Sequence, residues 1–385
     1  MKTTSFILTD VSKQIYVENC TITPAMLKTT GNWSVTKTRL KGGLSDGVDI
    51  IEVNNGRFSF TVVPTRGMNL WHGSCDGCFV GWNSPVKQIV NPAFVNLDEN
   101  GGLGFLKGMN ECLVHCGLNS TGVPGVDNGA HLTLHGKIAN LPAKYVEVQI
   151  VEGDAVEIKI IGIIDESRIF SQQMSLKSCY STKVGEAKVS LHDEVTNFGD
   201  LPAEMQMLYH CNFGEPFLEK GAKALIPTKK VVPRDDFAAT CVKKWDVYDG
   251  YTPGYTEQCM FHEVYADKNG DSLAMLKNKA GDKAAIVRFN KKQLPVFTQW
   301  KRPAGKNEGY VTGLEPAINF PNFRAFERNH GRIVNLQPGE TYAMDVAIEI
   351  CATKQQVAKA EAEVAAIMKG KKTTIAPKPT SDWVE

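Results

Sequence analysis

The sequence has no run of eighteen consecutive apolar residues, which excludes a membrane-spanning helix. The apolar stretch before Asp10 is too short for a secretory signal peptide, so we expect a cytoplasmic protein. A long basic run is also absent, and 43 lysines and arginines stand against 42 acidic residues. This balance gives no electrostatic footprint for nucleic acid and argues against a polyanionic substrate.

Motifs for cofactors and structural metals are scarce. The only CxxC is Cys75-Asp-Gly-Cys78, and it lacks the second pair that a zinc site would need. Its Asp-Gly step lies between apolar stretches and predicts a hairpin turn. The ten cysteines are scattered through 385 residues, which is typical of buried reduced thiols. Residues 85–129 are rich in glycine without the GxGxxG spacing, so they predict a long ordered loop and no dinucleotide cofactor.

Helical periodicity is scarce too, whereas apolar stretches of strand length recur from residue 30 to residue 350. Gly, Asn, Asp and Pro separate them, and this spacing predicts an all-β sandwich or barrel. One helix is predicted on the outside, because alanine, glutamate and lysine dominate residues 354–368. The chain then divides into an N-terminal segment (1–29), a β domain (30–352) and a C-terminal helix and tail (353–385). The clearest strands are Phe58–Val63, Tyr145–Val151, Ala155–Ile164, Ala187–Val195, Val296–Trp300 and Thr341–Cys351.

Glu315 lies inside an apolar stretch, residues 310–321, that otherwise predicts a buried strand. A carboxylate in such a place loses its hydration unless a charged or hydrogen-bonding group faces it. Pro316 has no N–H to give to a sheet, so the strand should end or reach an edge there. Glu315 is therefore either a structural carboxylate or an active-site group, and both interpretations remain open at this level.

Two histidines form similar polar outcrops. His210 ends an apolar stretch and is predicted at the rim of a sheet. His135 precedes Gly136, and if residues 131–135 form a strand, His131 and His135 share one face of it. Histidines so placed are either hydrogen-bonded structural residues or metal ligands.

Charged residues outside the apolar stretches occur at two further places. Arg66 comes just after the strand that ends at Val63, and its forked donors suit either a structural carboxylate or a ligand oxygen. Asp235 and Asp236 follow Pro233-Arg and predict a solvated turn.

The order of these motifs resembles the galactose mutarotase-like (aldose 1-epimerase) superfamily from about residue 30 to residue 350. The resemblance implies a large antiparallel β-supersandwich with a sugar-binding cleft on a concave face. Its specificity lies in the order of the motifs more than in any one of them. Those most similar to a branch known as DUF4432 are Asn110-Glu-Cys-Leu-Val-His-Cys-Gly117, Leu134-His-Gly136, Tyr209-His-Cys-Asn212 and Gly313-Leu-Glu-Pro316.

The resemblance also implies an activity, the interconversion of the anomers of a monosaccharide or sugar acid without a cofactor. Glu315 matches the base that takes the proton of the anomeric hydroxyl, and His210 matches the acid that protonates the ring oxygen. His135 matches the second histidine that binds the sugar, and Arg66 matches the arginine of the cleft. The residue types agree with this, since hemiacetal opening needs one group to remove a proton while another supplies one.

Some positions depart from the family pattern. The family's sugar-binding aspartate has no clear match, with Asp127 and Asp235 as its two stand-ins. Asn212 belongs to a shortened version of the motif around the acid, and it is expected in the substrate site. Trp300 and Lys301 have no counterpart, although a tryptophan suits stacking on a pyranose and a lysine suits an acidic sugar.

Two other functions remain open. One is a non-catalytic carbohydrate-binding protein that has kept the cleft. The other is a metal-assisted sugar isomerase or lyase with His131, His135, and His210 or Glu315 as ligands, because histidine and carboxylate suit a divalent transition metal. A small carbohydrate is the expected partner in every case, and a homodimer is compatible with the sequence.

Overall fold

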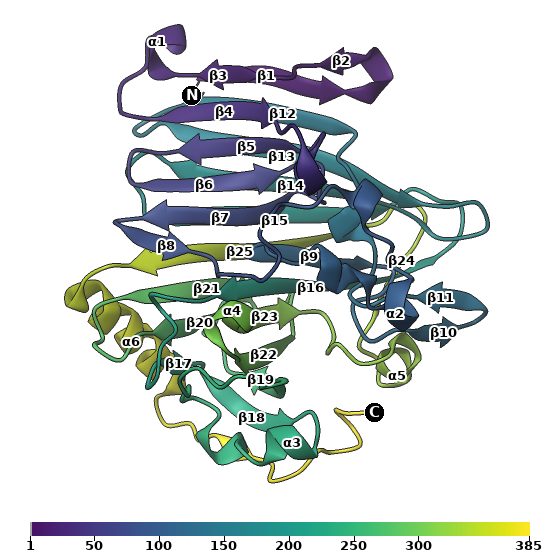
Figure 1. Ribbon diagram of the computed structural model, residues 1–385, viewed down its shortest axis with the longest axis vertical. Helices are drawn as coiled ribbons and strands as arrows, with labels where there is room; N and C mark the ends of the chain where they lie inside the picture. Colours follow the sequence, from purple (N-terminus) through teal and green to yellow (C-terminus); the bar gives the residue numbers. More distant parts are fainter. Residues whose placement is uncertain (1) are drawn as a thin grey trace.

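The computed structural model describes residues 2–385 and contains two large β-sheets that pack face to face (Figure 1). Paired strands are antiparallel, except that β18 and β26 run parallel. A separate hairpin is formed by β10 (Gly125–Asp127) and β11 (Ala130–Leu132). The fold is therefore the antiparallel supersandwich that the sequence predicts. None of the helices in residues 2–385 is long and apolar enough to cross a membrane.

The first sheet has ten strands and forms one layer of the sandwich. In spatial order these are β17 (Lys223–Leu225), β20 (Asp271–Lys277), β21 (Ala284–Asn290), β25 (Thr341–Cys351), β15 (Lys188–Asn197), β14 (Gln173–Lys183), β13 (Glu157–Ser167), β12 (Tyr145–Glu152), β1 (Lys2–Asp10) and β2 (Ile15–Tyr16).

The second sheet has fourteen strands, of which β24 (Val334–Leu336) pairs with β16 and β8 (Cys78–Val80) pairs with β7 beside the main path. Along that path lie β26 (Thr374–Ile375), β18 (Thr228–Pro233), β19 (Gln258–Val264), β22 (Val296–Pro303), β23 (Tyr310–Ala317), β16 (Ala203–Phe213), β9 (Leu113–Leu118), β7 (Asn69–Cys75), β6 (Phe58–Val63), β5 (Asp49–Asn54), β4 (Ser34–Arg39) and β3 (Cys20–Ile22).

Helices are few and lie at the periphery of the sandwich. They are α1 (Pro24–Leu27), α2 (Glu99–Gly102), α3 (Asp236–Ala239), α4 (Lys306–Gly309), α5 (Arg324–Asn329) and α6 (Lys354–Met368). The last buries Val357, Ala360 and Val364, spaced as one helix face, against β20 and β21 (Figure 1).

The core between the sheets is built from alternate residues of each strand. Along β13 the inward positions Ile158, Ile160, Gly162 and Ile164 are buried, while the residues that alternate with them are partly exposed. The outer face of this ten-stranded sheet is polar, and His192 there hydrogen-bonds to Asp345 of the neighbouring strand at 2.8 Å. This alternation made the fold class predictable.

Strands β16 and β23 differ because both of their faces are buried. Tyr209 and Leu314 point into the core between the sheets, so the residues beside them in sequence point to the outer face of the fourteen-stranded sheet. That outer face is covered by Trp82, Phe105 and Met109. We call residues 82–110 the covering segment. Polar side chains under it are therefore enclosed rather than solvated.

Three local predictions need correction. β11 ends at Leu132, and His135 has a left-handed backbone with φ of 58°, so His131 and His135 do not share a strand face. The loop predicted over residues 85–129 contains the central strand β9 and the short strand β10. Residues 2–29, expected as a segment before the β domain, supply β1 to one sheet and β3 to the other.

Beyond α6 the chain returns to the fourteen-stranded sheet. β26 pairs with β18, and Trp383 packs on Phe320 with ring centroids 5.0 Å apart. Its backbone carbonyl accepts a hydrogen bond from Asn322 at 2.8 Å. This tail, residues 373–385, thus lies beside the outer face that carries Trp300.

Candidate active site

His210 and Glu315 meet on the outer face of the fourteen-stranded sheet. Strands β16 and β23 pair in the same register on both sides of them, with Leu208 opposite Ala317 and Cys211 opposite Leu314. This register places His210 opposite Glu315. Pro316 leaves a gap in the ladder of backbone hydrogen bonds here. The His210 Nε2 and Glu315 Oε1 atoms lie 3.3 Å apart, and the side chains are only 5% and 2% exposed.

Gly313 makes this close approach feasible. A β-carbon at position 313 would lie 2.1 Å from Glu315 Oε1 and 3.1 Å from His210 Cε1. No side chain fits at the first distance, so the two functional groups occupy the space that any other residue would need. Glycine at position 313 is therefore what allows the two side chains to lie this close together.

Aromatic rings enclose the pair. His210 lies edge-on to Trp300 and to His135, with ring centroids 5.3 Å and 5.4 Å away. Phe105 of the covering segment contacts His135 in the same manner at 5.0 Å. The pair is therefore enclosed by residues of two strands, the turn at residue 135 and the covering segment, and we call this enclosed cluster the chamber.

His135 is fixed in one tautomer. Its Nδ1 lies 2.8 Å from the backbone carbonyl oxygen of Thr121. A carbonyl can only accept, so Nδ1 carries the hydrogen and donates it, which leaves Nε2 as an acceptor in the neutral ring.

Burial shifts the protonation of all three groups toward their neutral forms. It raises the pKa of Glu315 well above its ordinary value, with a further increase from Glu257. It lowers the pKa of His210 well below its ordinary value, and the neighbouring His135 lowers it further. Burial also lowers the pKa of His135. The site thus favours a protonated carboxyl group beside neutral imidazoles.

Unpaired polar atoms accompany these shifts. Within residues 2–385, His210 Nδ1 and Asn212 Oδ1 on β16 are buried without a hydrogen-bond partner. Leaving such a group unsatisfied costs about 1–3 kcal/mol, so buried polar atoms of this kind are typical of a ligand-binding site.

A family model for DUF4432, described as a domain of unknown function, matches residues 45–350. The chain belongs to the DUF4432 family. A crystal structure from Klebsiella pneumoniae, whose assignment as an aldose 1-epimerase is provisional, is 37% identical over 99% of both chains with a TM-score of 0.96. A comparison with curated proteins gave no match.

More distant structures share the fold with this DUF4432 protein. A galactose mutarotase-like protein from Clostridium acetobutylicum is 12% identical, with 83% of this chain and 98% of that chain covered and a TM-score of 0.57. A galactose mutarotase related enzyme from Lactobacillus acidophilus is 11% identical, with 79% and 98% covered and a TM-score of 0.54. At these identities the comparison concerns the fold alone.

Two residues that sequence reasoning missed hold Trp300 in this DUF4432 member. The indole Nε1 donates to Glu257 Oε2 at 2.8 Å, and Arg234 Nη1 donates to Glu257 Oε1 at 2.7 Å. Because Cys259 of β19 pairs with Trp300 of β22, Glu257, which directly precedes β19, lies near the indole. Only the strand pairing reveals this, since Arg234 and Glu257 each read as ordinary turn residues.

Arg66 does not join the chamber. Its guanidinium is fully buried, and Nε donates to Glu111 at 2.6 Å. The remaining donors bind the carbonyl oxygens of Val90 and Gly108 and the side chain of Asn140, at 3.0–3.1 Å. Arg66 thus anchors the covering segment, and its hydrogen bonds lie within the protein where a sugar contact was expected.

Lys301 and the two aspartates also have protein partners. Lys301 lies on the opposite face of β22 from Trp300, and its Nζ donates to the backbone oxygen of Val247 at 2.8 Å. Asp127 pairs with Arg324 and Arg328, each at 2.6 Å, which joins the β10–β11 hairpin to α5. Asp235 caps α3 through the backbone N–H of Ala238 at 2.7 Å.

Asn212 lies two residues from His210 on the same face of β16, and its Nδ2 donates to the backbone oxygen of Glu111 at 3.0 Å. Among the predicted site residues, the structure thus brings together Glu315, His210, His135, Trp300 and Asn212. In the part of the chain that the structure describes, no group of three or more His, Cys, Asp and Glu side chains is arranged to hold a metal ion.

Proposed function

We propose that this protein interconverts the anomers of a monosaccharide or sugar acid, with Glu315 as the base and His210 as the acid. The observation that carries the proposal is the 3.3 Å approach of Glu315 Oε1 to His210 Nε2 inside an enclosed chamber. Opening a cyclic hemiacetal removes a proton from the anomeric hydroxyl and adds one to the ring oxygen. Those two oxygens share one carbon atom, so the base and the acid must lie close enough to reach both at once.

The proton balance of this pair is favourable. In the forward step the Glu315 carboxylate takes the hydroxyl proton while the His210 imidazolium protonates the ring oxygen, the ring C–O bond breaks and the carbonyl forms. The pair ends as a carboxyl group beside a neutral imidazole. Rotation about the C1–C2 bond and the reverse transfers close the ring on its other face. The two states of the pair carry the same net charge, so the cycle needs no proton from water.

Burial supports this chemistry energetically. The raised pKa of Glu315 and the lowered pKa of His210 destabilise the ion pair that starts the reaction relative to the neutral pair that follows ring opening. The ion pair forms from the neutral pair of the free site by proton transfer between the two residues, and once formed it favours proton transfer from the sugar to Glu315 and from His210 to the ring oxygen.

The surrounding residues suit a sugar. Trp300 offers a flat apolar surface for the C–H face of a pyranose, and Glu257 fixes its orientation. His135 Nε2 is free to accept a hydrogen bond from a sugar hydroxyl, because Nδ1 donates to Thr121.

Exchange NMR tests the proposal. A panel of aldoses and uronates is measured with and without the protein, and the exchange rate between the α and β anomeric protons is recorded. We expect faster exchange for at least one sugar, and a decrease by a factor of about 10² to 10⁴ in both Glu315→Gln and His210→Asn. Glu263→Gln removes a surface carboxylate that pairs with Lys229, and it should leave exchange unchanged.

Two results would contradict the proposal. One is full activity in both site variants. The other is sugar binding with exchange at the spontaneous rate throughout the panel, which would identify a non-catalytic carbohydrate-binding protein.

A further inference from the structure

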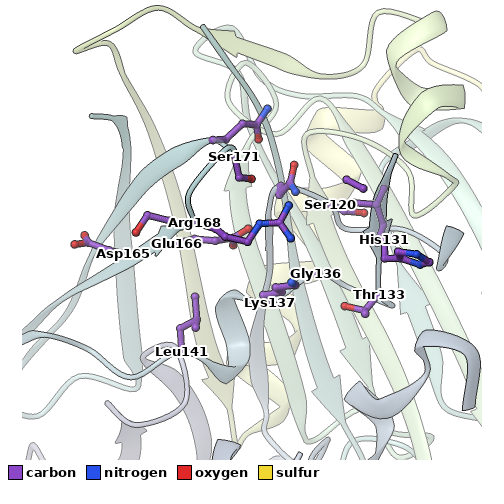
Figure 2. Close-up of a pocket in the computed structure, with 15 residues that line it drawn as sticks. Ser120, His131, Thr133, Gly136, Lys137, Leu141, Asp165, Glu166, Arg168 and Ser171 are labelled. Carbon is purple, nitrogen blue, oxygen red and sulfur yellow. The ribbon is translucent and has the colours of Figure 1, made fainter. Parts of the chain in front are cut away.

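A cavity lies apart from the enclosed Glu315–His210 pair. It has a volume of about 210 Å³ and opens between the end of β13 and the segment that follows β11 (Figure 2). Neither Glu315 nor His210 lines it. The segment around Ser120 and Thr121 separates the two, because Ser120 lines the cavity while the carbonyl of Thr121 binds His135 on the chamber side.

Two hydroxyl groups in the wall of this cavity lack partners. Ser120 and Thr133 are 1% and 2% exposed, and neither side-chain oxygen has a hydrogen-bond partner within residues 2–385. Each such orphan costs about 1–3 kcal/mol unless something satisfies it. Both residues border the cavity, so an occupant of the cavity is the available partner once each side chain turns its hydroxyl toward it.

Cationic side chains gather at the same cavity. Lys137 and Arg168 both line it and form no ion pair with another residue of the described chain. Figure 2 shows Arg168 and Glu166 on one side, with Ser120 and Thr133 across from them. Asp165 also lines the cavity, and its Oδ2 pairs with Lys144 while its Oδ1 is buried without a hydrogen-bond partner. Two cations without an ion-pair partner thus share the cavity with the carboxylates of Glu166 and Asp165.

Glu166 is oriented to accept hydrogen bonds. Its Oε2 accepts from the backbone N–H of Leu118 at 2.9 Å, which holds the carboxylate at the cavity wall. Leu132 and Leu141 contribute apolar surface. Fixed acceptors, free hydroxyls and an apolar wall are the features that bind a polyol, and a guanidinium beside an ammonium binds an anionic oxygen group.

We propose that this cavity binds a small polyhydroxylated anion, a sugar acid or a sugar phosphate. The anionic group contacts Arg168 and Lys137, and ligand hydroxyls contact Ser120, Thr133 and Glu166. The volume lies below the roughly 300 Å³ at which pockets for drug-sized ligands begin, so the ligand is of monosaccharide size. The proposal does not depend on the activity proposed for the Glu315–His210 pair.

Isothermal titration calorimetry on the purified full chain tests this. The probes are glucuronate, glucose 6-phosphate, neutral glucose and inorganic phosphate. To exclude binding at the first site, each probe is also titrated into Trp300→Ala, which removes the flat surface proposed to hold a sugar there. We expect saturable binding of glucuronate or glucose 6-phosphate that persists in Trp300→Ala and weakens at least tenfold in Arg168→Met and Lys137→Met. Whichever of the two sugar anions binds identifies the anionic group.

Lys354→Met is the matched control, because this exposed lysine lies at the start of α6, outside the residues that line the cavity. It should bind as the unaltered protein does. Arg168 is exposed, so its replacement should leave the fold intact, and circular dichroism checks this. Ser120→Ala combined with Thr133→Val should weaken binding of the sugar anion while leaving any binding of inorganic phosphate unchanged.

Three outcomes would overturn the proposal. The first is no binding of either sugar anion at millimolar concentration. The second is binding that Arg168→Met leaves unchanged. The third is equal affinity for glucose and glucuronate, or for inorganic phosphate and glucose 6-phosphate, since either result removes one half of the proposed recognition.

Discussion

At the residue scale, the site depends on groups held in protonation states that water would not favour. Glu315 and His210 are close enough to exchange a proton, and both are enclosed. Since the raised pKa of Glu315 comes mainly from burial, its protein environment destabilises the carboxylate. Reactivity and stability are therefore opposed at this one residue.

We expect Glu315→Gln to become more stable than the unaltered protein as the pH rises. A carboxyl group with a raised folded pKa contributes stability below its unfolded pKa of about 4.3 and loses it as the pH rises toward the folded value. Glutamine has no such dependence, so its advantage should grow by up to about 1.4 kcal/mol per pH unit in this range. Urea unfolding at pH 5 and pH 7 measures it. His210 contributes in the opposite direction, since its lowered pKa makes stability rise with pH up to about 6.5, and this contribution is common to both proteins.

The surface variant Glu263→Gln serves as the control and should show no such divergence. A constant difference between Glu315→Gln and the unaltered protein at both pH values would mean that Glu315 is ionised in the folded state.

Gly313→Ala should remove activity by displacing the pair. The added carbon would lie 2.1 Å from Glu315 Oε1, so the carboxyl group must move away from His210. We expect at least about a hundredfold slower anomer exchange and a loss of about 1–3 kcal/mol of stability. Gly250→Ala is the comparison, because its nearest contact is the side chain of Lys220 at 3.4 Å. If Gly313→Ala exchanged anomers at the normal rate, the close approach of Glu315 to His210 would not be needed for the reaction.

At the scale of elements, strand pairing decides which predicted residues meet. Trp300 and Lys301 are neighbours in sequence, yet β22 directs one toward the chamber and the other toward the opposite face. Strict alternation along the strand Val296–Trp300 could have separated them in advance. Asp127 and Arg66 could not be assigned this way, because their ionic partners come from distant segments.

The tail closes one side of the chamber at this scale. Trp383 and Val384 pack in the cluster that contains Phe320 and Trp300. A chain that ends at residue 379 should keep its fold, because the deletion removes residues 380–385 and leaves β26 paired with β18. We expect the KM for the sugar identified by NMR to rise severalfold with little change in kcat, since Trp300 loses a neighbour that limits its movement. Lys378→Ala is the control within the tail, and an unchanged KM in the shortened chain would exclude the tail from the chamber wall.

The fold was more predictable than the site. β25 and α6 have the predicted bounds, because each is specified by local periodicity. β14 was missed since its inward positions include the polar Ser178 and Thr182, which interrupt the apolar pattern. The approach of Glu315 to His210 spans two separate strands, and only the family resemblance could suggest it. Glu257 gave no sequence signal at all, because its role depends on the register between β19 and β22.

At the scale of the whole molecule, both sheets depend on the N-terminal residues for an edge. β1 pairs with β12 along most of its length, from Lys2 opposite Glu152 to Asp10 opposite Tyr145. A chain that starts at residue 19 should expose the edge of β12 and associate in a concentration-dependent way. Light scattering after size-exclusion chromatography measures the association.

Gln149→Lys in the shortened chain should reduce this association by placing a charge on the exposed edge strand. If the shortened chain keeps the mass of the full-length protein at every concentration, the edge of β12 is protected by something other than β1.

The near-complete enclosure of His210 and Glu315 also sets a limit on apparent affinity. If a complex with sugar requires the covering segment or the tail to stay displaced, the measured dissociation constant equals the intrinsic constant divided by the fraction of molecules that are open. If about one molecule in a hundred is open, a complex that is micromolar once formed is measured as roughly a hundredfold weaker. Weak binding in solution would then mean that the open form is rare. Variants that weaken the packing of Phe105 would increase the fraction of open molecules and bind the sugar more tightly than the native protein.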